Sequence, residues 1–151
     1  MRSLRYWLPA VLWSCMILAA STDLFSAAQT GSLLDQAIRL VLGHSLPAPL
    51  FALVHELGRK CGHISAYGIA SALYYRAIRK GARGWSSGAA VIAIALAAAL
   101  GSIDETHQSF IPSRSGTPAD VAIDTLGAIL AQLIIYRVAI PLARRGVTLQ
   151  E

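Results

Sequence analysis

Ionisable side chains are concentrated in one short part of the chain, between Asp104 and Asp124, with a long apolar segment on either side. A charge in or beside a membrane is costly to desolvate, so it usually faces a bundle interior or a water-filled cavity and has a partner. Side chains of these types can bind an anion through a guanidinium or transfer protons through an imidazole or a carboxyl group. We therefore expect any functional site to lie here, among Asp104, Glu105, His107, Gln108, Arg114, Asp120 and Asp124.

Helical spacing adds a second segment to this candidate site. Lys60, His63 and Tyr67 stand at positions i, i+3 and i+7, which places a cation, an imidazole and a phenol on one face of a helix. Asp120 and Asp124 are four residues apart and share a face in the same way. The predicted mixed-charge binding pocket consists of Lys60, His63, Tyr67, Glu105, Gln108, Arg114, Asp120 and Asp124.

Structural roles are an alternative for these residues. Asp120 fits a helix cap, and an ion pair with Lys60 or Arg114 would satisfy Asp124 without any ligand. Asp124 needs such a partner, because an unpaired carboxylate inside a membrane costs about 2.5 kcal/mol or more.

The sequence predicts neither a cofactor nor a metal ion. The two cysteines, Cys15 and Cys61, form no CxxC pair, and the different membrane depths expected for them argue against a disulfide. Side chains of metal-ligand type are present, but no local spacing such as HExxH joins them: His63, Glu105, Asp120 and Asp124.

Composition indicates one small membrane domain over residues 1–151. The chain is 55% hydrophobic and 14% charged, with a mean hydropathy of +0.54. A helix needs roughly 20 residues to cross the hydrocarbon core of a bilayer. Four apolar segments are long enough or nearly so, and they predict an all-α, multi-pass protein with a four-helix transmembrane bundle: about 6–25, 61–78, 85–103 and 121–142.

The charged residues sort by side if Met1 is cytoplasmic and all four segments cross. Nine of the 13 basic residues then lie on the cytoplasmic side, as the positive-inside rule expects, and seven of the eight acidic residues lie on the other. We therefore read the net charge of +5 as a topology signal rather than a nucleic-acid footprint, with both termini cytoplasmic and the polar cluster outside. A cleavable signal peptide is the alternative for the N-terminus, because Arg2 and Arg5 precede an apolar run; its removal would reverse the charge sorting.

Local signals predict how the connections fold. Ser32 with Asp35 resembles a capping box, so a short amphipathic helix is expected over 32–42, ending at Gly43 and lying at the outer membrane surface or packed over the bundle. The next helix is expected to begin at about Leu50 and to continue into the second span. Thr117 fits an N-cap, with proline at the first helical position and Asp120 at the third.

Small residues in the third apolar segment predict close helix packing. They recur at every fourth position, which lets helix backbones approach in lipid, although an alanine-rich span also produces such a pattern by chance. The same face, one step further along, points Glu105 at a neighbouring helix. The ladder consists of Ala89, Ala93, Ala97 and Gly101.

The spaced motif resembles the VanZ-like family of small bacterial membrane proteins. It reads K-x-x-H-x-x-x-Y from Lys60, D-E-x-H-Q-x-F-x-P-x-R from Asp104 and T-x-x-D-x-x-x-D-x-x-G from Thr117, and the resemblance covers about residues 55 to 135. Two positions depart from it, since Asp124 stands where the family often has Asn and Ile64 where an aromatic residue is common. The resemblance implies the cytoplasmic membrane of a bacterial cell envelope. The family is named for a protein associated with resistance to the glycopeptide teicoplanin, and the resemblance implies no mechanism.

Three functions follow as alternatives. The first is an envelope protein whose outward-facing pocket engages an anionic, lipid-linked component through Lys60 and Arg114. The second is a hydrolase or transferase acting on a lipid phosphate or a lipid-linked sugar, with His63 or Glu105 as acid or base; no serine or cysteine nucleophile has an evident base beside it. The third is a structural subunit that assists another membrane protein. Contact with the lipid bilayer is expected in all three, while the ligand, the protein partner and the oligomeric state stay open.

Overall fold

Helices make up the fold, and the described part of the chain contains no strand. A computed structural model describes residues 3–22, 26–82, 84–112, 114 and 116–139. The predicted ends of the first and fourth spans, and the chain termini whose side was predicted, lie outside these residues. The elements are α1 (Leu4–Ala20), α2 (Ala27–Leu42), α3 (Ala48–Arg79), α4 (Ser87–Ser109), α5 (Pro118–Ile134) and a π-helical turn, η2 (Ile135–Ala139).

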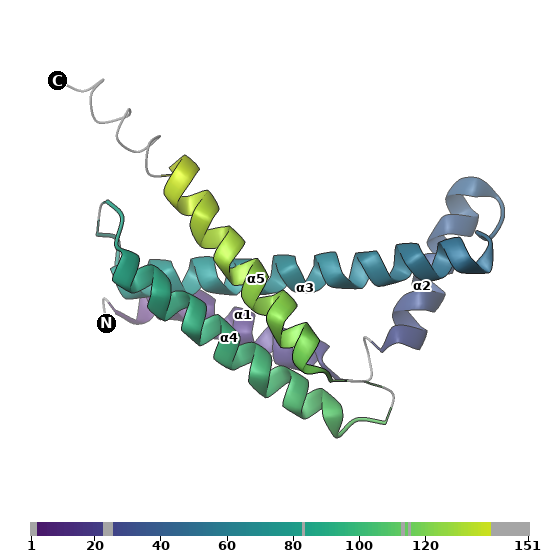
Figure 1. The fold of residues 1–151 in the computed structure, drawn as a ribbon, viewed down its shortest axis with the longest axis horizontal. Coiled ribbons are helices and arrows are strands. Elements are labelled where there is room, and N and C mark those ends of the chain that lie inside the picture. The colour runs from purple at the N-terminus through teal and green to yellow at the C-terminus, as the bar shows by residue number, and fades with distance from the viewer. Residues whose placement is uncertain (1–2, 23–25, 83, 113, 115, 140–151) are drawn as a thin grey trace.

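The second half of α3 is the centre of a helix bundle. It packs against α1, α4 and α5, and α4 also packs against α5. The first half of α3 extends away from the bundle and carries α2 at its end (Figure 1). We call α2 together with residues 48–60 of α3 the arm.

Small residues form much of the bundle core, which confirms the predicted ladder. Its three alanines are 6% exposed or less, and Gly101 is buried beside them. One step further on the same face, Glu105 is also buried. Close packing continues at Gly127 on α5, where an added Cβ would overlap the backbone of Ile64 on α3. The glycine is therefore needed for the two helices to touch.

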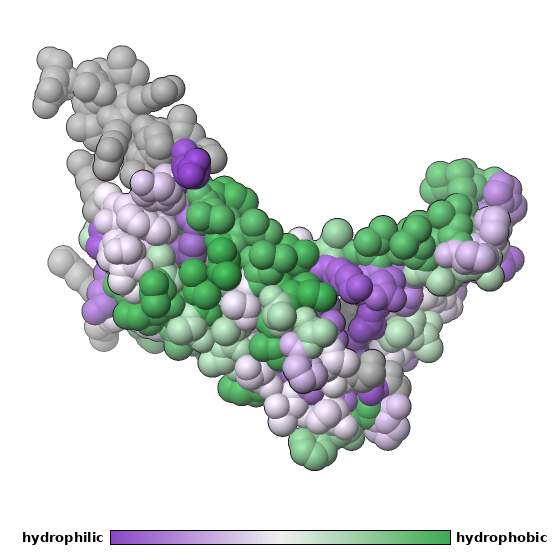
Figure 2. Space-filling view, viewed as in Figure 1, coloured by the Kyte–Doolittle hydropathy of each residue, from purple (hydrophilic) through white to green (hydrophobic). Residues whose placement is uncertain are grey.

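The all-helical prediction is confirmed, but only two of the four predicted spans meet the requirements for crossing a membrane. Within the described residues, Ser87–Ser109 and Pro118–Arg137 are long and apolar enough, whereas α1 is apolar but has only 17 residues. α3 is long, yet polar side chains such as His63 and Arg76 dilute its apolar stretch. Figure 2 shows hydrophobic surface along the outside of the bundle and a hydrophilic patch in the hollow between the arm and α5.

Several helix boundaries differ from the predicted ones. α2 begins at Ala27 with Ser26 as N-cap, so the capping box predicted at Ser32 is wrong, although Gly43 ends the helix in the left-handed conformation as expected. α4 continues six residues past 103, because its polar end is amphipathic and buries the side chains Asp104, Glu105 and Gln108 against the bundle.

The start of α5 agrees with the prediction. Thr117 is the N-cap, its side chain accepts a hydrogen bond from the backbone N–H of Asp120, and Pro118 occupies the first turn.

Candidate functional site

His63 and Asp124 meet where α3 crosses α5. Nδ1 of His63 lies 2.9 Å from Oδ1 of Asp124, within hydrogen-bond distance. The Asp124 side chain is completely buried, whereas 24% of the His63 side chain is exposed. An ion pair of Asp124 with Lys60 or Arg114 was the alternative predicted from the sequence. In the structure, the partner of Asp124 is instead His63 on the facing helix.

Glu105 ties the end of α4 to the beginning of α5. Its Oε2 accepts a hydrogen bond of 3.0 Å from the backbone N–H of Thr117. The loop between the two helices comes so close that an added Cβ at Gly116 would overlap the carbonyl group of Glu105. Asp120 accepts a 2.9 Å hydrogen bond from the Thr117 hydroxyl, so it has the capping role that the sequence allowed.

Tyr67, Asp104 and Gln108 form a buried hydrogen-bonded group between α3 and α4. The Tyr67 hydroxyl donates to Oδ2 of Asp104 at 2.9 Å, and Nε2 of Gln108 donates to the same oxygen at 3.1 Å. All three side chains are 3% exposed or less. The Tyr67 ring also stacks on the His63 ring, with centroids 6.3 Å apart, so this group fixes one side of the histidine.

Arg114 connects the loop after α4 to the end of α1. Its Nη2 donates to the carbonyl oxygens of Ala20 at 2.7 Å and Thr22 at 2.9 Å. Carbonyl groups at a helix C-terminus lack helical partners and carry partial negative charge, so a cation there is favourable. Arg114 thus has a structural role beside the predicted one in anion binding.

Lys60 forms an ion pair within α3 itself. Its Nζ lies 2.8 Å from Oε1 of Glu56, one turn earlier, and the two side chains are 48% and 65% exposed. The hydrogen bond from Lys60 lowers the pKa of Glu56 below its ordinary value, and the same contact raises the pKa of Lys60. Lys60 is therefore already neutralised by a neighbour on the arm.

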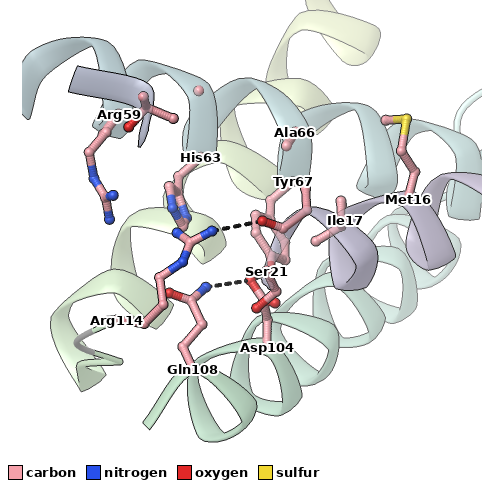
Figure 3. Close-up of a pocket in the computed structure, with 13 residues that line it drawn as sticks. Met16, Ile17, Ser21, Arg59, His63, Ala66, Tyr67, Asp104, Gln108 and Arg114 are labelled. Atoms are coloured by element: carbon pink, nitrogen blue, oxygen red, sulfur yellow. Dashed lines mark hydrogen bonds between the residues drawn. The ribbon is translucent and has the colours of Figure 1, made fainter. Parts of the chain in front are cut away.

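Two cavities meet at His63. The first cavity, of about 280 Å³, lies between α1, α3 and α4, and the second, of about 560 Å³, lies between the arm and the start of α5. Figure 3 shows the Arg114 guanidinium next to the His63 ring and Arg59 beyond His63 on α3, while apolar side chains line the other end of the first cavity. His63 and Arg59 are common to both linings, and Lys60 and Asp120 border only the second.

The eight residues predicted for one pocket are thus divided among the two cavities and the buried interior behind His63. His63, Tyr67, Gln108 and Arg114 line the first cavity. Asp124 and Glu105 lie behind the histidine, away from both linings.

Two residues that line the first cavity were not among the eight predicted for the binding pocket, although Asp104 was expected in the region of the site. Arg59 stands four residues before His63, and Asp104 four before Gln108, so helical spacing was the signal that could have found both.

Carboxylate oxygens near His63 are left without hydrogen-bond partners. Among the described residues, Oε1 of Glu105 and Oδ2 of Asp124 are buried and accept no hydrogen bond. One ligand atom each from His63, Glu105 and Asp124 can be chosen so that all lie within 4.8 Å of one another. Asp120 does not belong to this group, and these three are the side chains best placed to hold a metal ion.

Comparison with protein families matches residues 6–140 to the VanZ/LLP1 family. No curated protein and no solved structure matched the chain. The match extends from α1 to the end of the described residues, and it includes every residue of the candidate site. Together with the two apolar helices, it indicates a membrane-associated protein. The chain belongs to the VanZ/LLP1 family.

Proposed function

We propose that this protein is a multi-pass protein of the bacterial cytoplasmic membrane that binds an anionic, lipid-linked component of the cell envelope in the first cavity. The observation that carries the proposal is the two-sided lining of that cavity. Arg59, Arg114 and His63 offer hydrogen-bond donors at one end, and apolar groups such as Met16 and Ile17 line the other.

An amphiphilic ligand matches this lining. A guanidinium can donate two parallel hydrogen bonds to phosphate oxygens, and arginine is weakly hydrated enough to do so in a partly buried place. Lipid-binding sites combine a mostly apolar wall with a few polar groups that fix the headgroup. Arg59 is the better candidate for the headgroup contact, because the guanidinium of Arg114 also holds the end of α1.

The proposal places the two cavities on the extracytoplasmic side, with α1, α3, α4 and α5 as the four spans. The sorting of basic residues toward the opposite side supports this orientation. Nucleoside triphosphates are not available as phosphate donors on the extracytoplasmic side. The ligand is therefore expected to carry its phosphate before it reaches the protein. Linkage to glycopeptide resistance is part of this proposal through family membership alone.

Lipid-dependent thermal stabilisation tests the proposal. Purified protein is unfolded in detergent with added polyprenyl phosphate, phosphatidylglycerol or phosphatidylcholine. We expect polyprenyl phosphate to raise the unfolding temperature of the wild type, since a ligand that binds only the folded state stabilises it by mass action. Arg59→Gln should remove most of this shift.

Arg39→Gln is the matched control. Arg39 is an exposed arginine of α2 that pairs with Asp35 and lines neither cavity. The proposal is wrong if Arg59→Gln and Arg39→Gln respond alike to polyprenyl phosphate, or if phosphatidylcholine stabilises the protein as well as the anionic lipids do.

Hydrolysis or transfer at a lipid phosphate is a second candidate, and the contact between His63 and Asp124 favours it. A carboxylate on one ring nitrogen orients an imidazole for proton transfer at the other nitrogen. Release of phosphate from a polyprenyl diphosphate should then stop in His63→Ala and persist in His107→Ala, since His107 is exposed at the end of α4. The same rate in both variants, or no turnover by the wild type, would rule this candidate out.

A further inference from the structure

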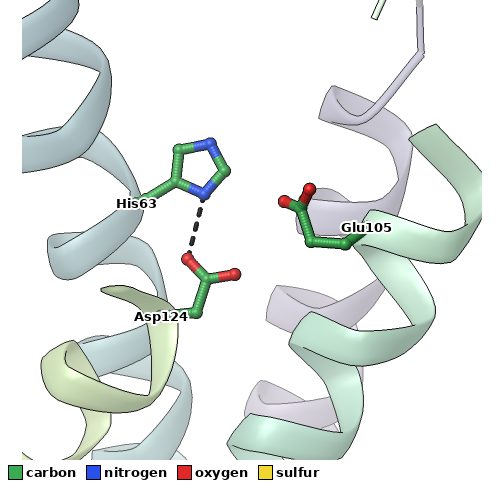
Figure 4. Close-up of side chains that lie close together, drawn as sticks. All are labelled: His63, Glu105 and Asp124. Atoms are coloured by element: carbon green, nitrogen blue, oxygen red, sulfur yellow. Dashed lines mark hydrogen bonds and ion pairs between the residues drawn. The ribbon is translucent and has the colours of Figure 1, made fainter. Parts of the chain in front are cut away.

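We propose that His63, Glu105 and Asp124 bind a divalent transition-metal ion, with zinc as the best match. The three side chains come from three different helices, α3, α4 and α5, and their ligand atoms lie within 4.8 Å of one another. Figure 4 shows the Glu105 carboxylate turned toward the imidazole and toward the free oxygen of Asp124. This proposal concerns ion binding alone and does not depend on the lipid proposed above.

Burial without hydrogen bonds is the first argument. Glu105 is 5% exposed and Asp124 0%, and one oxygen of each carboxylate has no partner in the described part of the chain. Leaving a buried acceptor unsatisfied costs about 1–3 kcal/mol, and more for a charged group. Because a ligand atom of each carboxylate lies within 4.8 Å of one of the other, a single cation between them would supply the missing partner.

Ligand chemistry is the second argument. Two carboxylates carry two negative charges, which a divalent ion neutralises, and a neutral imidazole is a good ligand for zinc but a poor one for magnesium or calcium. Zinc lies about 2.1 Å from such ligands, so ligand atoms around it are separated by roughly 3.4 Å in a tetrahedral site. A rotation of the side chains that shortens the longest separation, at most 4.8 Å, by up to about 1.4 Å therefore gives zinc-like distances.

Supporting contacts around the cluster are the third argument. The Thr117 backbone N–H holds the other oxygen of Glu105, and the Tyr67 ring stacks on His63. Such outer contacts orient metal ligands in known sites. Three protein ligands leave at least one coordination position for water or an anion, which is the arrangement of catalytic rather than structural zinc sites.

Metal content measured on the purified protein tests the proposal. The protein carries an affinity tag without histidine, is loaded with zinc, passed through a desalting column and analysed by mass spectrometry of the elements. We expect one zinc ion per folded chain in the wild type and near zero in Glu105→Gln and Asp124→Asn. Zinc affinity should fall by more than the 10- to 100-fold that loss of an outer contact typically costs.

Asp35→Asn is the control, because it removes the charge of a carboxylate on α2 that pairs with Arg39 and does not belong to the cluster. It should retain zinc. Both test substitutions keep the side-chain shape, and a sharp thermal unfolding transition without zinc identifies variants that are folded. Absence of stoichiometric zinc in folded wild type, or equal zinc content in all variants, overturns the proposal; cobalt replacing zinc should give a visible absorption spectrum that is lost with His63→Asn.

Discussion

Tyr67 shows at the scale of one residue how a polar group is kept inside this bundle. Its hydroxyl donates to one oxygen of Asp104 while its ring stacks on His63, so one side chain links the carboxylate on α4 to the histidine of the site. Asp104 receives a second hydrogen bond from Gln108, and neither partner alone saturates a carboxylate. Both bonds end on Oδ2, and the other oxygen of Asp104, Oδ1, is buried without a hydrogen-bond partner among the described residues.

Tyr67→Phe is therefore expected to destabilise the protein. It removes one of the two hydrogen bonds, from Tyr67 and Gln108, that Asp104 accepts in the bundle, and loss of a donor to a buried carboxylate typically costs about 1–3 kcal/mol. Thermal or denaturant unfolding in detergent measures the change. Tyr136→Phe is the control, because Tyr136 is 47% exposed and a phenylalanine keeps its ring contact with Trp85. Equal stability of the two variants would show that the Asp104 hydrogen bond contributes nothing.

At the scale of the helices, glycine residues determine how closely α3 and α5 pack. Gly127 leaves no room for a side chain against Ile64, and across the same contact a Cβ on Gly68 would lie 3.2 Å from the carbonyl oxygen of Gly127. Close backbone approach of this kind is a main source of helix association in lipid. The short separation also brings His63 within reach of Asp124.

Gly127→Ala should push α5 away from α3. The cost is expected at about 1–3 kcal/mol, as for other overpacked cores, and the contact between His63 and Asp124 should lengthen with it. Gly58→Ala, on α3 where nothing lies within 4 Å, should instead stabilise the protein slightly, because alanine favours a helix. Unfolding temperatures of both variants test the pair; a Gly127→Ala variant as stable as wild type contradicts the close packing.

A second contact joins the same helices further along. Nε2 of Gln132 donates to the hydroxyl of Ser71 at 2.8 Å and to its carbonyl oxygen at 3.1 Å, and both residues are buried. Gln132→Leu should cost about 0.6 kcal/mol, with about 1.7 as an upper limit, the range of hydrogen bonds between membrane helices. Thr125→Val removes only a bond within α5 and should cost less in the same unfolding assay. A larger loss of stability in Thr125→Val than in Gln132→Leu would mean that the interhelical hydrogen bond does not stabilise the protein.

Sequence patterns predicted contacts that are local or periodic and missed those that join distant segments. The cap at Thr117 and the buried alanine ladder follow from neighbouring residues and from helical spacing alone. The hydrogen bonds from Arg114 to α1 join segments more than 90 residues apart and end on backbone carbonyls, which leave no side-chain pattern. The pairing of Asp124 with His63 depended on which helices cross, and periodicity within a helix does not specify that.

At the scale of the whole molecule, α4 has its two ends at opposite ends of the bundle (Figure 1). If α4 spans the membrane, Ala82 before it and Phe110 after it lie on opposite sides, and both are exposed in the structure. We expect an impermeant thiol reagent on intact cells to label Phe110→Cys and not Ala82→Cys, because the basic residues predict a cytoplasmic Ala82.

The labelling background carries Cys15→Ala and Cys61→Ala, since both native cysteines are free and exposed. Labelling of Ala82→Cys alone would invert the topology and bring cytoplasmic metabolites into consideration as ligands. Labelling of both positions in intact cells would show that α4 does not cross.

The unbroken course of α3 has a mechanical consequence. Its 32 residues form a rod of about 48 Å, and His63 lies near its midpoint. A helix without an internal break resists bending, so force applied to the arm is transmitted to Arg59 and His63 as a tilt or a twist of one lever. A partner that binds α2 would therefore change the shape of the two cavities from a distance. In the same way, a ligand bound in the cavities would change the orientation of the arm.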